Sequence, residues 1–296
     1  MSNSSIRDVL RATAQDTLGI LPILLGILRT KEDAHRSVKF STESLRFLVP
    51  IPVPLHSQPA TIKVTNEDTL NAAVRIWALG DRDDPSQGRP AVLNFANSLK
   101  PGGGWINGAM AQEEAICYRS SLALSLNPHL YPLHKDEGLY SPYVLVVRGD
   151  MATGHHYIDA EPDQLPVVSV LTVPALNNPE LRTFWYPHSY SVSGEPMTLR
   201  EKQIFRNDED RDITKGKMRL ALRMAAQHGH RKLVLGALGC GVFGNPPEDI
   251  AHCWLSVLLE DEFDGNRWNE VCFAVYDPKN EGNYEIFKEV LSGWKV

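Results

Sequence analysis

The chain has 296 residues, of which 43% are apolar and 22% charged, an ordinary globular composition. A chain of this length buries most of its apolar surface without disulfide bonds, and its four scattered cysteines lack the close pairs of a zinc site. The net charge of −6 excludes a general nucleic-acid binder, which needs a strong basic field. We therefore expect an intracellular protein with reduced thiols, in the cytoplasm or the nucleus.

The N-terminal part, residues 1–60, is expected to be a helical extension packed on the core. Its main helix is predicted over residues 5–30, with a break or kink at Pro22. The apolar stretch 18–28 is shorter than the roughly 20 residues that span a bilayer, and it lacks the features of a signal peptide. We interpret it as a helix packed on the domain, with a helix on a membrane surface as the alternative. Strand-like character follows over residues 37–47.

From residue 61 to residue 296, short apolar segments alternate with amphipathic helix patterns. The strands are expected at 61–64, 91–95, 143–147, 167–173, 232–238 and 271–276. Helices are expected at 69–79 after a cap at Asn66 or Asp68, from about 113 to 124, from about 214 to 228, after a cap at Asn245, and at 283–291. A polar turn is expected at 81–88, and residues 174–211 lack periodicity, which indicates a functional flap or a mobile loop. The alternation predicts one α/β domain with a mixed, mostly parallel sheet between helices.

One segment, residues 97–114, leaves a strand, passes three consecutive glycines and ends in two carboxylates where a helix begins. Adjacent glycines let the backbone approach a ligand closely, at a cost in stability. A glutamine positions ligands through hydrogen bonds, and paired carboxylates supply acid–base chemistry. The candidate residues are Gly102, Gly103, Gly104, Gln112, Glu113 and Glu114. The pattern indicates cleavage of a bond in an oxygen-rich ligand; the alternative is a solvated acidic first turn that the helix dipole favours.

A second glycine-rich segment lies between a predicted strand and a predicted helix. It consists of Gly239, Cys240, Gly241, Val242, Phe243 and Gly244, which satisfy the dinucleotide fingerprint G-x-G-x-x-G. A Rossmann enzyme is disfavoured because the motif lies in the last quarter of the chain, and no acidic residue ends a following strand at the required distance. Backbone amides at such a turn bind diphosphate, so we expect a diphosphate loop, with a tight structural turn as the alternative.

The triple glycine followed seven residues later by Gln-Glu-Glu resembles the signature of poly(ADP-ribose) glycohydrolases. Residues 235–245 resemble the diphosphate loop of the same family almost throughout, and the likeness runs from about residue 66 to residue 290. It is closest to the compact, bacterial-type branch, which also occurs in fungi and consists of little beyond a macrodomain. The resemblance implies a macrodomain-like, three-layer α/β/α sandwich.

The resemblance also implies roles for the carboxylates. Glu114 would protonate the departing ribose oxygen and then deprotonate the attacking water, while Glu113 would hold the ribose hydroxyls. Gln112 would steady the loop. The helix dipole lowers the pKa of a glutamate at this position, whereas a second carboxylate, burial against ligand and a diphosphate raise it. Our hypothesis is therefore that the acid forms only when substrate closes the site.

Three further residues receive binding roles by resemblance. Asn97, in the word Asn-Phe-Ala-Asn, would contact the distal ribose, and Phe243 would pack against the terminal ribose. Tyr276, at the expected end of the last strand, would contact the adenine. Taken alone, Asn97 is more typical of a turn residue. The alternatives for the other two are a loop aromatic that caps the core at Phe243 and, with equal weight, a core tyrosine at Tyr276.

The implied activity is hydrolysis of ribose–ribose O-glycosidic bonds in poly(ADP-ribose), with release of ADP-ribose and no metal or other cofactor. Such an enzyme reverses poly-ADP-ribosylation, a modification of the DNA damage response. The implied partners are poly(ADP-ribose), ADP-ribose and poly-ADP-ribosylated proteins; direct contact with DNA or a membrane is not expected, and we expect a monomer. Two alternatives remain: a module that binds ADP-ribose without hydrolysing it, and a hydrolase of mono-ADP-ribosylated proteins. Cleavage at chain ends or within the chain also remains open.

Overall fold

The computed structural model describes residues 3–49, 51, 53–80, 89–187 and 199–296. Its central sheet has seven strands in the order β1-β4-β5-β3-β8-β9-β2. Their bounds are β1 (Val38–Ser41), β2 (Ile62–Thr65), β3 (Ala91–Phe95), β4 (Glu137–Leu145), β5 (Val167–Val173), β8 (Lys232–Leu235) and β9 (Glu270–Ala274). Strands β5, β3, β8, β9 and β2 pair in parallel, and β4 pairs antiparallel with both of its neighbours. The predicted α/β fold with a mixed, mostly parallel sheet is confirmed.

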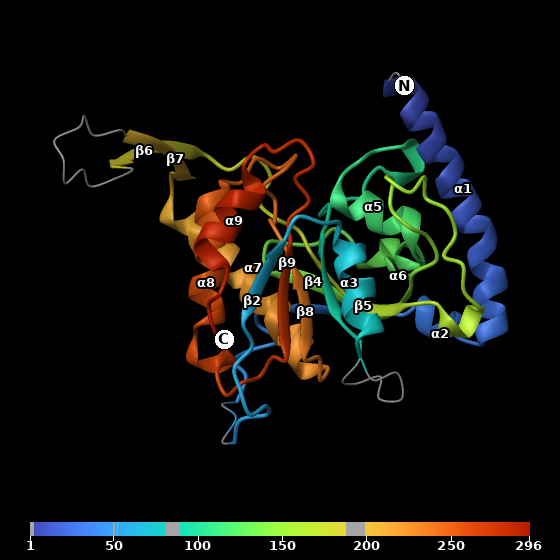
Figure 1. Cartoon of the computed structure of the whole chain (residues 1–296), viewed down its shortest axis with the longest axis horizontal. Coiled ribbons are helices and arrows are strands. Elements are labelled where there is room, and N and C mark those ends of the chain that lie inside the picture. The colour runs from blue at the N-terminus through green and yellow to red at the C-terminus, as the bar shows by residue number, and fades with distance from the viewer. Residues whose placement is uncertain (1–2, 50, 52, 81–88, 188–198) are drawn as a thin grey trace.

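Helices cover both faces of this sheet, giving three layers (Figure 1). One face carries α7 (Asp208–Gln227), α8 (Pro247–Leu258) and α9 (Asn283–Leu291). The other face carries α3 (Thr69–Ala78), α5 (Gln112–Arg119) and α6 (Leu122–Ser125), with α1 (Asn3–Leu28) and α2 (Lys31–Ala34) beside them. Short 3₁₀ helices lie in the loops at η1 (Trp105–Asn107), η2 (Pro128–Leu130), η3 (Pro162–Gln164) and η4 (Asp261–Phe263).

Strand β3 shows how the sheet separates the two cores. Successive side chains of a strand point to opposite faces. Ala91 and Leu93 accordingly pack with the α7–α8–α9 layer, whereas Val92 packs with α3 and α5. The same alternation turns Asn94 toward α5, where its amide contacts Glu113. The periodicity of a buried strand therefore delivers a polar side chain to the start of α5.

Helix α1 corrects the prediction of a break at Pro22, because the helix runs without interruption from Asn3 to Leu28. A proline inside a helix removes one backbone hydrogen bond. Here Pro22 lies on the exposed side, while Leu21 and Leu25 are buried against the core and hold the helix on both sides of it. The interpretation of residues 18–28 as a packed helix is thus confirmed. Among the described helices, none combines the length and apolarity needed to cross a bilayer.

The helix predicted from about residue 113 to 124 ends early, at Arg119. Ser120 is extended and pairs with Val146, which interrupts the helix before α6 begins. The hydroxyl of Ser120 donates to the carbonyl of Ile116, a local hydrogen bond of the kind that competes with helix continuation. The apolar repeat across residues 116–124 therefore belongs to two helices rather than to one.

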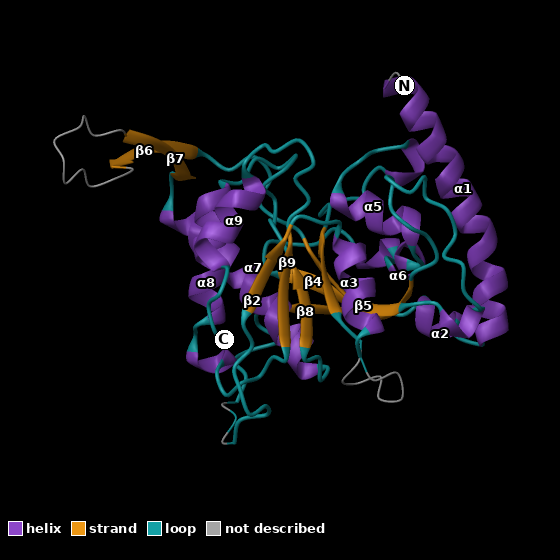
Figure 2. Cartoon of the chain, in the orientation of Figure 1, coloured by secondary structure: helices purple, strands orange, loops and turns teal. Residues whose placement is uncertain are grey.

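Residues 174–211, interpreted from the sequence as a functional flap or a mobile loop, contain two strands that were not predicted, and the role of this stretch stays a prediction. A two-stranded antiparallel hairpin, β6 (Leu181–Pro187) with β7 (Leu199–Phe205), projects from the body of the protein, and α7 begins at Asp208 rather than near residue 214 (Figure 2). The side chains of residues 182–185 are all exposed, so β6 has no alternating apolar pattern by which sequence would reveal it. The remainder of this stretch, 188–198, and the turn predicted at 81–88 lie outside the described residues.

Several strands have bounds that differ from the prediction, three of them by more than one residue at an end that bears on the site or the sheet. Strand β4 begins earlier, at Glu137; β8 ends at Leu235 instead of 238; β9 ends at Ala274 instead of 276. After β8 and β9 the chain turns directly into loops, so residues 236–238 and 275–276 belong to the loops at the edge of the sheet. Strand β1 lies within residues 1–60 and pairs in the central sheet; the division at residue 60 stays a prediction.

Candidate active site

A cavity of about 360 Å³ lies at the carboxyl ends of the parallel strands β2, β3, β8 and β9. Its lining includes Asp68, Thr69, Phe95, Gln112, Tyr118, Arg119, Asp150, Gly239, Cys240, Gly241, Val242, Phe243 and Tyr276. In open α/β sheets, ligands bind in the crevice outside the carboxyl ends of the strands. The position and size of the cavity are those of a small-molecule site.

Gln112 fastens the start of α5 to the end of β3. Its carbonyl oxygen accepts a hydrogen bond from the backbone N–H of Phe95 at 2.8 Å. Its amide group donates to the carbonyl oxygen of Leu93 at 2.7 Å and to the hydroxyl of Thr69 at 3.2 Å. All polar atoms of this side chain are therefore used to join the helix, the strand and α3.

Glu113 is almost completely buried, with 3% of its surface exposed. One carboxylate oxygen accepts from the backbone N–H of Asn97 at 2.8 Å, and the other accepts from the side-chain amide of Asn94 at 3.3 Å. Burial, assisted by the charge of Glu114, raises the pKa of Glu113 to about 8 although these hydrogen bonds lower it. Burial in the protein alone, without bound substrate, therefore raises the pKa of Glu113. The hypothesis that the acid forms only when substrate closes the site stays a prediction.

Glu114 contacts the glycine loop rather than β3. It is 8% exposed. One of its oxygens accepts from the N–H of Gly104 at 2.9 Å, and the other accepts from the N–H of Ala111, the residue before the helix, at 3.1 Å. The second contact is the side-chain-to-backbone half of a capping box. The two adjacent glutamates thus point to different partners.

Gly103 cannot carry a side chain in this arrangement. Its φ is +59°, and a Cβ atom at this position would lie 2.3 Å from a carboxylate oxygen of Glu114 and 3.2 Å from one of Glu113. Gly102 has φ +68°, and its Cβ atom would lie 2.9 Å from the ring of Trp105. The triple glycine was expected to let the backbone approach a ligand closely. In this structure Gly103 lets the backbone approach the side chains of Glu113 and Glu114.

Asn97 forms a turn with its side chain. Its oxygen accepts from the backbone N–H groups of Leu99 at 2.9 Å and Lys100 at 3.0 Å, the geometry of an Asx turn. Its own N–H group donates to Glu113. The predicted contact of Asn97 with a ribose stays a prediction.

The second glycine loop is held from behind by Asn245. This side chain was predicted to cap α8, and that prediction was wrong: the N-cap of α8 is Pro246. The amide of Asn245 donates to the carbonyl of Leu176 at 2.7 Å, and also to those of Gly239 at 3.2 Å and Phe243 at 3.3 Å. The buried side chain of Asn245 therefore holds both ends of the loop together. Gly239, at the start of the loop, adopts a φ of +75°.

The outer side chains of this loop and of the segment after β9 face the cavity. Phe243 is half-buried, and Val242 and Tyr276 are exposed. Tyr276 lies two residues beyond the end of β9, so it does not end the strand and is not a core tyrosine. Cys240 lies in the same loop, and burial raises the pKa of its thiol. All four cysteines of the chain are free.

Apart from Gly244, which belongs to neither, the predicted residues fall into two groups. Those in the lining of the cavity are Gln112, Gly239, Cys240, Gly241, Val242, Phe243 and Tyr276. Those bonded to one another around the start of α5 are Asn97, Gly104, Glu113 and Glu114, with Gly102 and Gly103 between them. Gln112 is adjacent to the glutamates in the chain and lines the cavity, so it connects the two groups.

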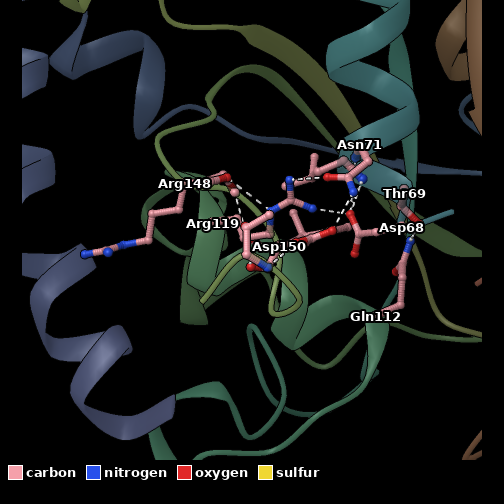
Figure 3. A network of polar contacts seen from close by, with 12 residues as sticks. Asp68, Thr69, Asn71, Gln112, Arg119, Arg148 and Asp150 are labelled. Carbon is pink, nitrogen blue, oxygen red and sulfur yellow. Dashed lines mark hydrogen bonds and ion pairs between the residues drawn. The ribbon is translucent and has the colours of Figure 1, made fainter. Parts of the chain in front are cut away.

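Sequence reasoning missed a polar network in the wall of the cavity (Figure 3). The guanidinium of Arg119, the last residue of α5, pairs with Asp68 and donates to the side chain of Asn71 at 2.7 Å. Asn71 in turn donates to Asp150 at 2.6 Å. Only Asp68 had a signal in the sequence, as a candidate cap of α3, and it does cap that helix. The other members come from separate elements that only the fold brings together.

The charges of this network are stabilised inside the wall. Burial alone would raise the pKa of Asp150, but hydrogen bonds from Asn71 and Thr153, with the charge of Arg119, lower it below its usual value. Burial lowers the pKa of Arg119, whose guanidinium nevertheless keeps its charge in proteins. The wall therefore presents the ionised carboxylate of Asp150 to the cavity.

The fold and the site define the class: an α/β protein with a cavity at the carboxyl ends of parallel strands, lined by a second glycine-rich loop and by Gln112, next to which two buried, loop-bound glutamates lie in the chain. The family model that matches this chain is the catalytic domain of microbial-type PARG, over residues 15–149. No curated protein sequence matches the chain.

Solved structures extend the comparison over nearly the whole chain. A poly(ADP-ribose) glycohydrolase of Thermomonospora curvata bound to the inhibitor ADP-HPD is 30% identical, with a TM-score of 0.71, and the match covers 96% of this chain and 99% of that one. The same organism's enzyme without the inhibitor is 29% identical with a TM-score of 0.72, at the same coverage. The Deinococcus radiodurans enzyme in complex with ADP-ribose is 28% identical with a TM-score of 0.62, covering 87% of this chain and 96% of that one. The chain belongs to the poly(ADP-ribose) glycohydrolase family.

Proposed function

We propose that this family member hydrolyses the ribose–ribose O-glycosidic bond of poly(ADP-ribose) with Glu114 as its acid–base residue, releasing ADP-ribose. The observation that supports the proposal most directly is the placement of Glu113 and Glu114 at the start of α5, each bonded to a backbone amide of the loop that precedes it. The related structures that hold ADP-ribose or ADP-HPD support the cavity as the place where the ADP-ribose unit binds.

In the proposed reaction, Glu114 gives its proton to the ribose oxygen that leaves, and the glycosidic bond breaks with oxocarbenium-like charge on the sugar. The resulting carboxylate then takes a proton from the water that attacks this carbon, which restores the acid. Glu113 is largely protonated at neutral pH because of its burial, so it can donate a hydrogen bond to a ribose hydroxyl. The two adjacent glutamates thus divide proton transfer and sugar binding between them.

The second loop supplies the complementary part of the proposed site. Backbone N–H groups of the segment from Gly239 to Gly244 would bind the diphosphate, as amides at the start of a helix do. Phe243 would pack against the terminal ribose, Tyr276 would contact the adenine and Asn97 the distal ribose. The net charge of −6 makes such local binding necessary, because the protein offers no general attraction to a polyanion.

The remaining assignments belong to the same proposal. We propose a macrodomain-type catalytic domain over residues 61–296 with residues 1–60 packed on it, acting as a monomer on poly-ADP-ribosylated proteins. No group of three or more His, Cys, Asp or Glu side chains suited to a metal ion occurs among the described residues. The reaction as proposed uses only side chains, backbone amides and water.

The experiment compares the wild type with Glu114→Gln. Release of ADP-ribose from an auto-poly(ADP-ribosyl)ated protein is measured by chromatography, and binding of ADP-ribose by calorimetry. We expect the variant to lose about 100- to 10,000-fold in rate, the usual contribution of a positioned acid–base group. Binding of ADP-ribose should stay close to that of the wild type, because glutamine keeps the shape of the side chain.

The matched control is Glu209→Gln, which makes the same change at an exposed glutamate in the first turn of α7. It should leave both rate and binding unaltered. Binding of ADP-ribose by wild type and Glu114→Gln with release by neither would replace the hydrolase with an ADP-ribose-binding module. Release from mono-ADP-ribosylated protein alone would replace it with a mono-ADP-ribosyl hydrolase.

A further inference from the structure

Two buried arginines connect the N-terminal helix to the wall of the cavity. Arg119 is 2% exposed and Arg148 is 5% exposed. The side-chain nitrogen Nε of Arg119 donates to the backbone carbonyl of Arg148 at 3.2 Å, and the N–H of Arg148 donates back to the carbonyl of Arg119 at 3.2 Å. The end of α5 and the segment after β4 are thus locked together by these two residues (Figure 3).

On the inner side, the guanidinium of Arg119 organises the cavity wall. It pairs with one oxygen of Asp68, the same oxygen that accepts the capping N–H groups at the start of α3. Through Asn71 it also orients Asp150, whose second oxygen accepts from the N–H of Thr153 at 2.9 Å. Asp68, Arg119 and Asp150 all line the cavity. These contacts of Asp68 are all made by Oδ1, and together they fix the orientation of the whole carboxylate, including Oδ2.

On the outer side, α1 holds the guanidinium of Arg148. Asp16 pairs with it, and the hydroxyl of Thr17 accepts from its Nε at 2.8 Å. The ring of Tyr157 lies under the guanidinium at 3.8 Å, and its hydroxyl donates to Asp16 at 2.8 Å. The third donor of Arg148 reaches the carbonyl of His155 at 2.9 Å. Each donor group of the Arg148 side chain therefore has a partner. Two of these partners, Asp16 and Thr17, lie on α1.

Helix α1 also contacts the site more directly. Thr17 donates to the carbonyl of Tyr118 at 2.8 Å. The hydroxyl of Tyr118 in turn donates to the carbonyls of Trp105 at 2.7 Å and Ala109 at 2.9 Å, which fixes the segment after the triple glycine. Leu10 of α1 lies in the lining of the cavity. Helix α1 is therefore connected to the site by the hydrogen bond of Thr17 and by the packing of Leu10.

We infer that Arg148 and Arg119 are positioning residues through which Asp16 and Thr17 of α1 hold the carboxylates of Asp68 and Asp150 in place for substrate binding. The ligand part concerned is one that offers hydrogen-bond donors, such as amino or hydroxyl groups of a nucleoside. The inference deepens the proposed function and rests on it for the identity of the ligand. It places the determinant of affinity on a helix whose key side chain, Asp16, does not line the cavity.

The test uses the full chain with Asp16→Ala, and Asp8→Ala as the matched control. Both aspartates lie on α1 and pair with an arginine, but the partner of Asp8 is Arg11 of the same helix, on the exposed surface. We expect Asp16→Ala to weaken binding of ADP-ribose and to raise KM for the polymer by about tenfold, the order of effect of residues that act through others. The kcat should stay within about twofold, because the contacts of Glu113 and Glu114 are untouched.

A second variant, Arg148→Lys, keeps the charge but loses the forked contacts, since lysine cannot form them simultaneously. It should show the same separation of KM from kcat. Thermal unfolding of each variant is measured so that assays are run well below its melting temperature. Weaker stability with unchanged ADP-ribose affinity in Asp16→Ala, or equal effects of Asp8→Ala and Asp16→Ala, would overturn the inference.

The outcomes also separate this inference from the proposed function. If the wild type releases no ADP-ribose from the polymer but binds ADP-ribose, the proposed hydrolysis fails, and the affinities of the variants still decide the role of the arginines. If the wild type is active and Asp16→Ala binds ADP-ribose as the wild type does, only the positioning role fails.

Discussion

At the scale of residues, the two glutamates of α5 differ because they are bonded to different parts of the site. Glu113 is bonded to Asn94 of β3 and to Asn97, two residues beyond this strand, whereas Glu114 is bonded to the glycine loop and the residue before the helix. A change in the loop therefore acts on Glu114 first. A change in pH acts on Glu113, whose pKa is raised to about 8.

The loop contact predicts the effect of Gly103→Ala. The new Cβ atom would lie 2.3 Å from a carboxylate oxygen of Glu114, and alanine would have to adopt φ +59°. We expect a loss of about 1–2 kcal/mol in the free energy of unfolding from the left-handed backbone, and a large loss of activity because the carboxylate must move. Denaturant unfolding and release of ADP-ribose measure the two effects.

The control for this variant is Gly216→Ala in α7, where a Cβ atom meets nothing within 4 Å and φ is not positive. It should stabilise the protein by about 0.5–1 kcal/mol, the helix preference of alanine over glycine, with activity unchanged. If Gly103→Ala were as active as the wild type, the loop would not control the position of Glu114.

The raised pKa of Glu113 predicts a contribution to stability that falls with rising pH. In the folded protein the group keeps its proton up to about pH 8, whereas in the unfolded chain it releases the proton near its usual pKa of 4.5. Between these values the folded state binds more protons, so the free energy of unfolding decreases through this group as pH rises. Replacing Glu113 with glutamine removes this dependence.

The difference in the free energy of unfolding between Glu113→Gln and the wild type should therefore grow in favour of the variant from about pH 4.5 to pH 8 and then level off. Urea unfolding at a series of pH values measures it. The same series with Glu209→Gln, an exposed glutamate, should give a flat difference. A flat difference for Glu113→Gln as well would show that its folded pKa is not raised.

Several candidate site residues could be predicted because residues of the required chemical types stand close together in the sequence. The triple glycine, the glutamine and the glutamates lie within one short segment, as do the residues of the second loop. Arg119 and Arg148 gave no such signal: each is a single arginine at the end of an apolar segment, and its partners lie at residues 16–17 and 68–71. Contacts between distant segments depend on the fold, which periodicity alone does not specify.

At the scale of elements, predictions succeeded where burial imposes a pattern. Strands β3 and β5 and helices α8 and α9 were located from their apolar residues, and all of them face the core. The hairpin β6–β7 escaped prediction because residues 182–185 of β6 are all exposed and show no apolar alternation. The continuation of α1 through Pro22 escaped for a related reason, since packing by Leu21 and Leu25 outweighs the local preference of proline.

Helix α7 provides a prediction at this scale, because it makes two forked ion pairs one turn apart. Arg223 pairs with Glu262 at 2.8 and 2.6 Å and is buried, and Arg219 pairs with Glu260 at 2.7 Å twice and is about one-third exposed. Arg223→Met leaves Glu262 buried without its partner, so we expect it to lower the free energy of unfolding by about 3–5 kcal/mol.

Arg219→Met is the matched control and should cost about 1 kcal/mol or less, because water solvates the remaining glutamate. Urea unfolding of both variants measures the difference. If both variants lost the same free energy of unfolding, burial would not increase the cost of removing one partner of an ion pair. Restoration of stability by the double change Arg223→Met with Glu262→Gln would identify the unpaired charge as the cause.

At the scale of the whole molecule, a protein with net charge −6 is proposed to act on a polyanion. Proteins that bind nucleic acid through many phosphate contacts lose about 10³- to 10⁵-fold in affinity between about 50 and 200 mM salt, because counterions return to the polymer. A site that binds one ADP-ribose unit through backbone amides neutralises few charges. Its affinity should therefore depend only weakly on salt.

We expect KM for poly(ADP-ribose) to rise less than about tenfold over the same range of salt, and DNA not to compete. Rates at several salt concentrations, with and without duplex DNA, test this. A salt dependence as steep as that of a DNA-binding protein, or inhibition by DNA, would reveal a basic surface that the overall charge conceals.

Helix α5 has a consequence for how this protein can change. Its eight residues carry the glutamates at one end and Arg119 at the other, so one rigid helical segment, about 7.5 Å long from Glu114 to Arg119, sets the offset between proton transfer and the cavity wall. Inserting or deleting one residue within it would rotate one end against the other by about 100°. Substitutions can alter either end of α5 separately, whereas an insertion or a deletion within it would change the relative position of both ends.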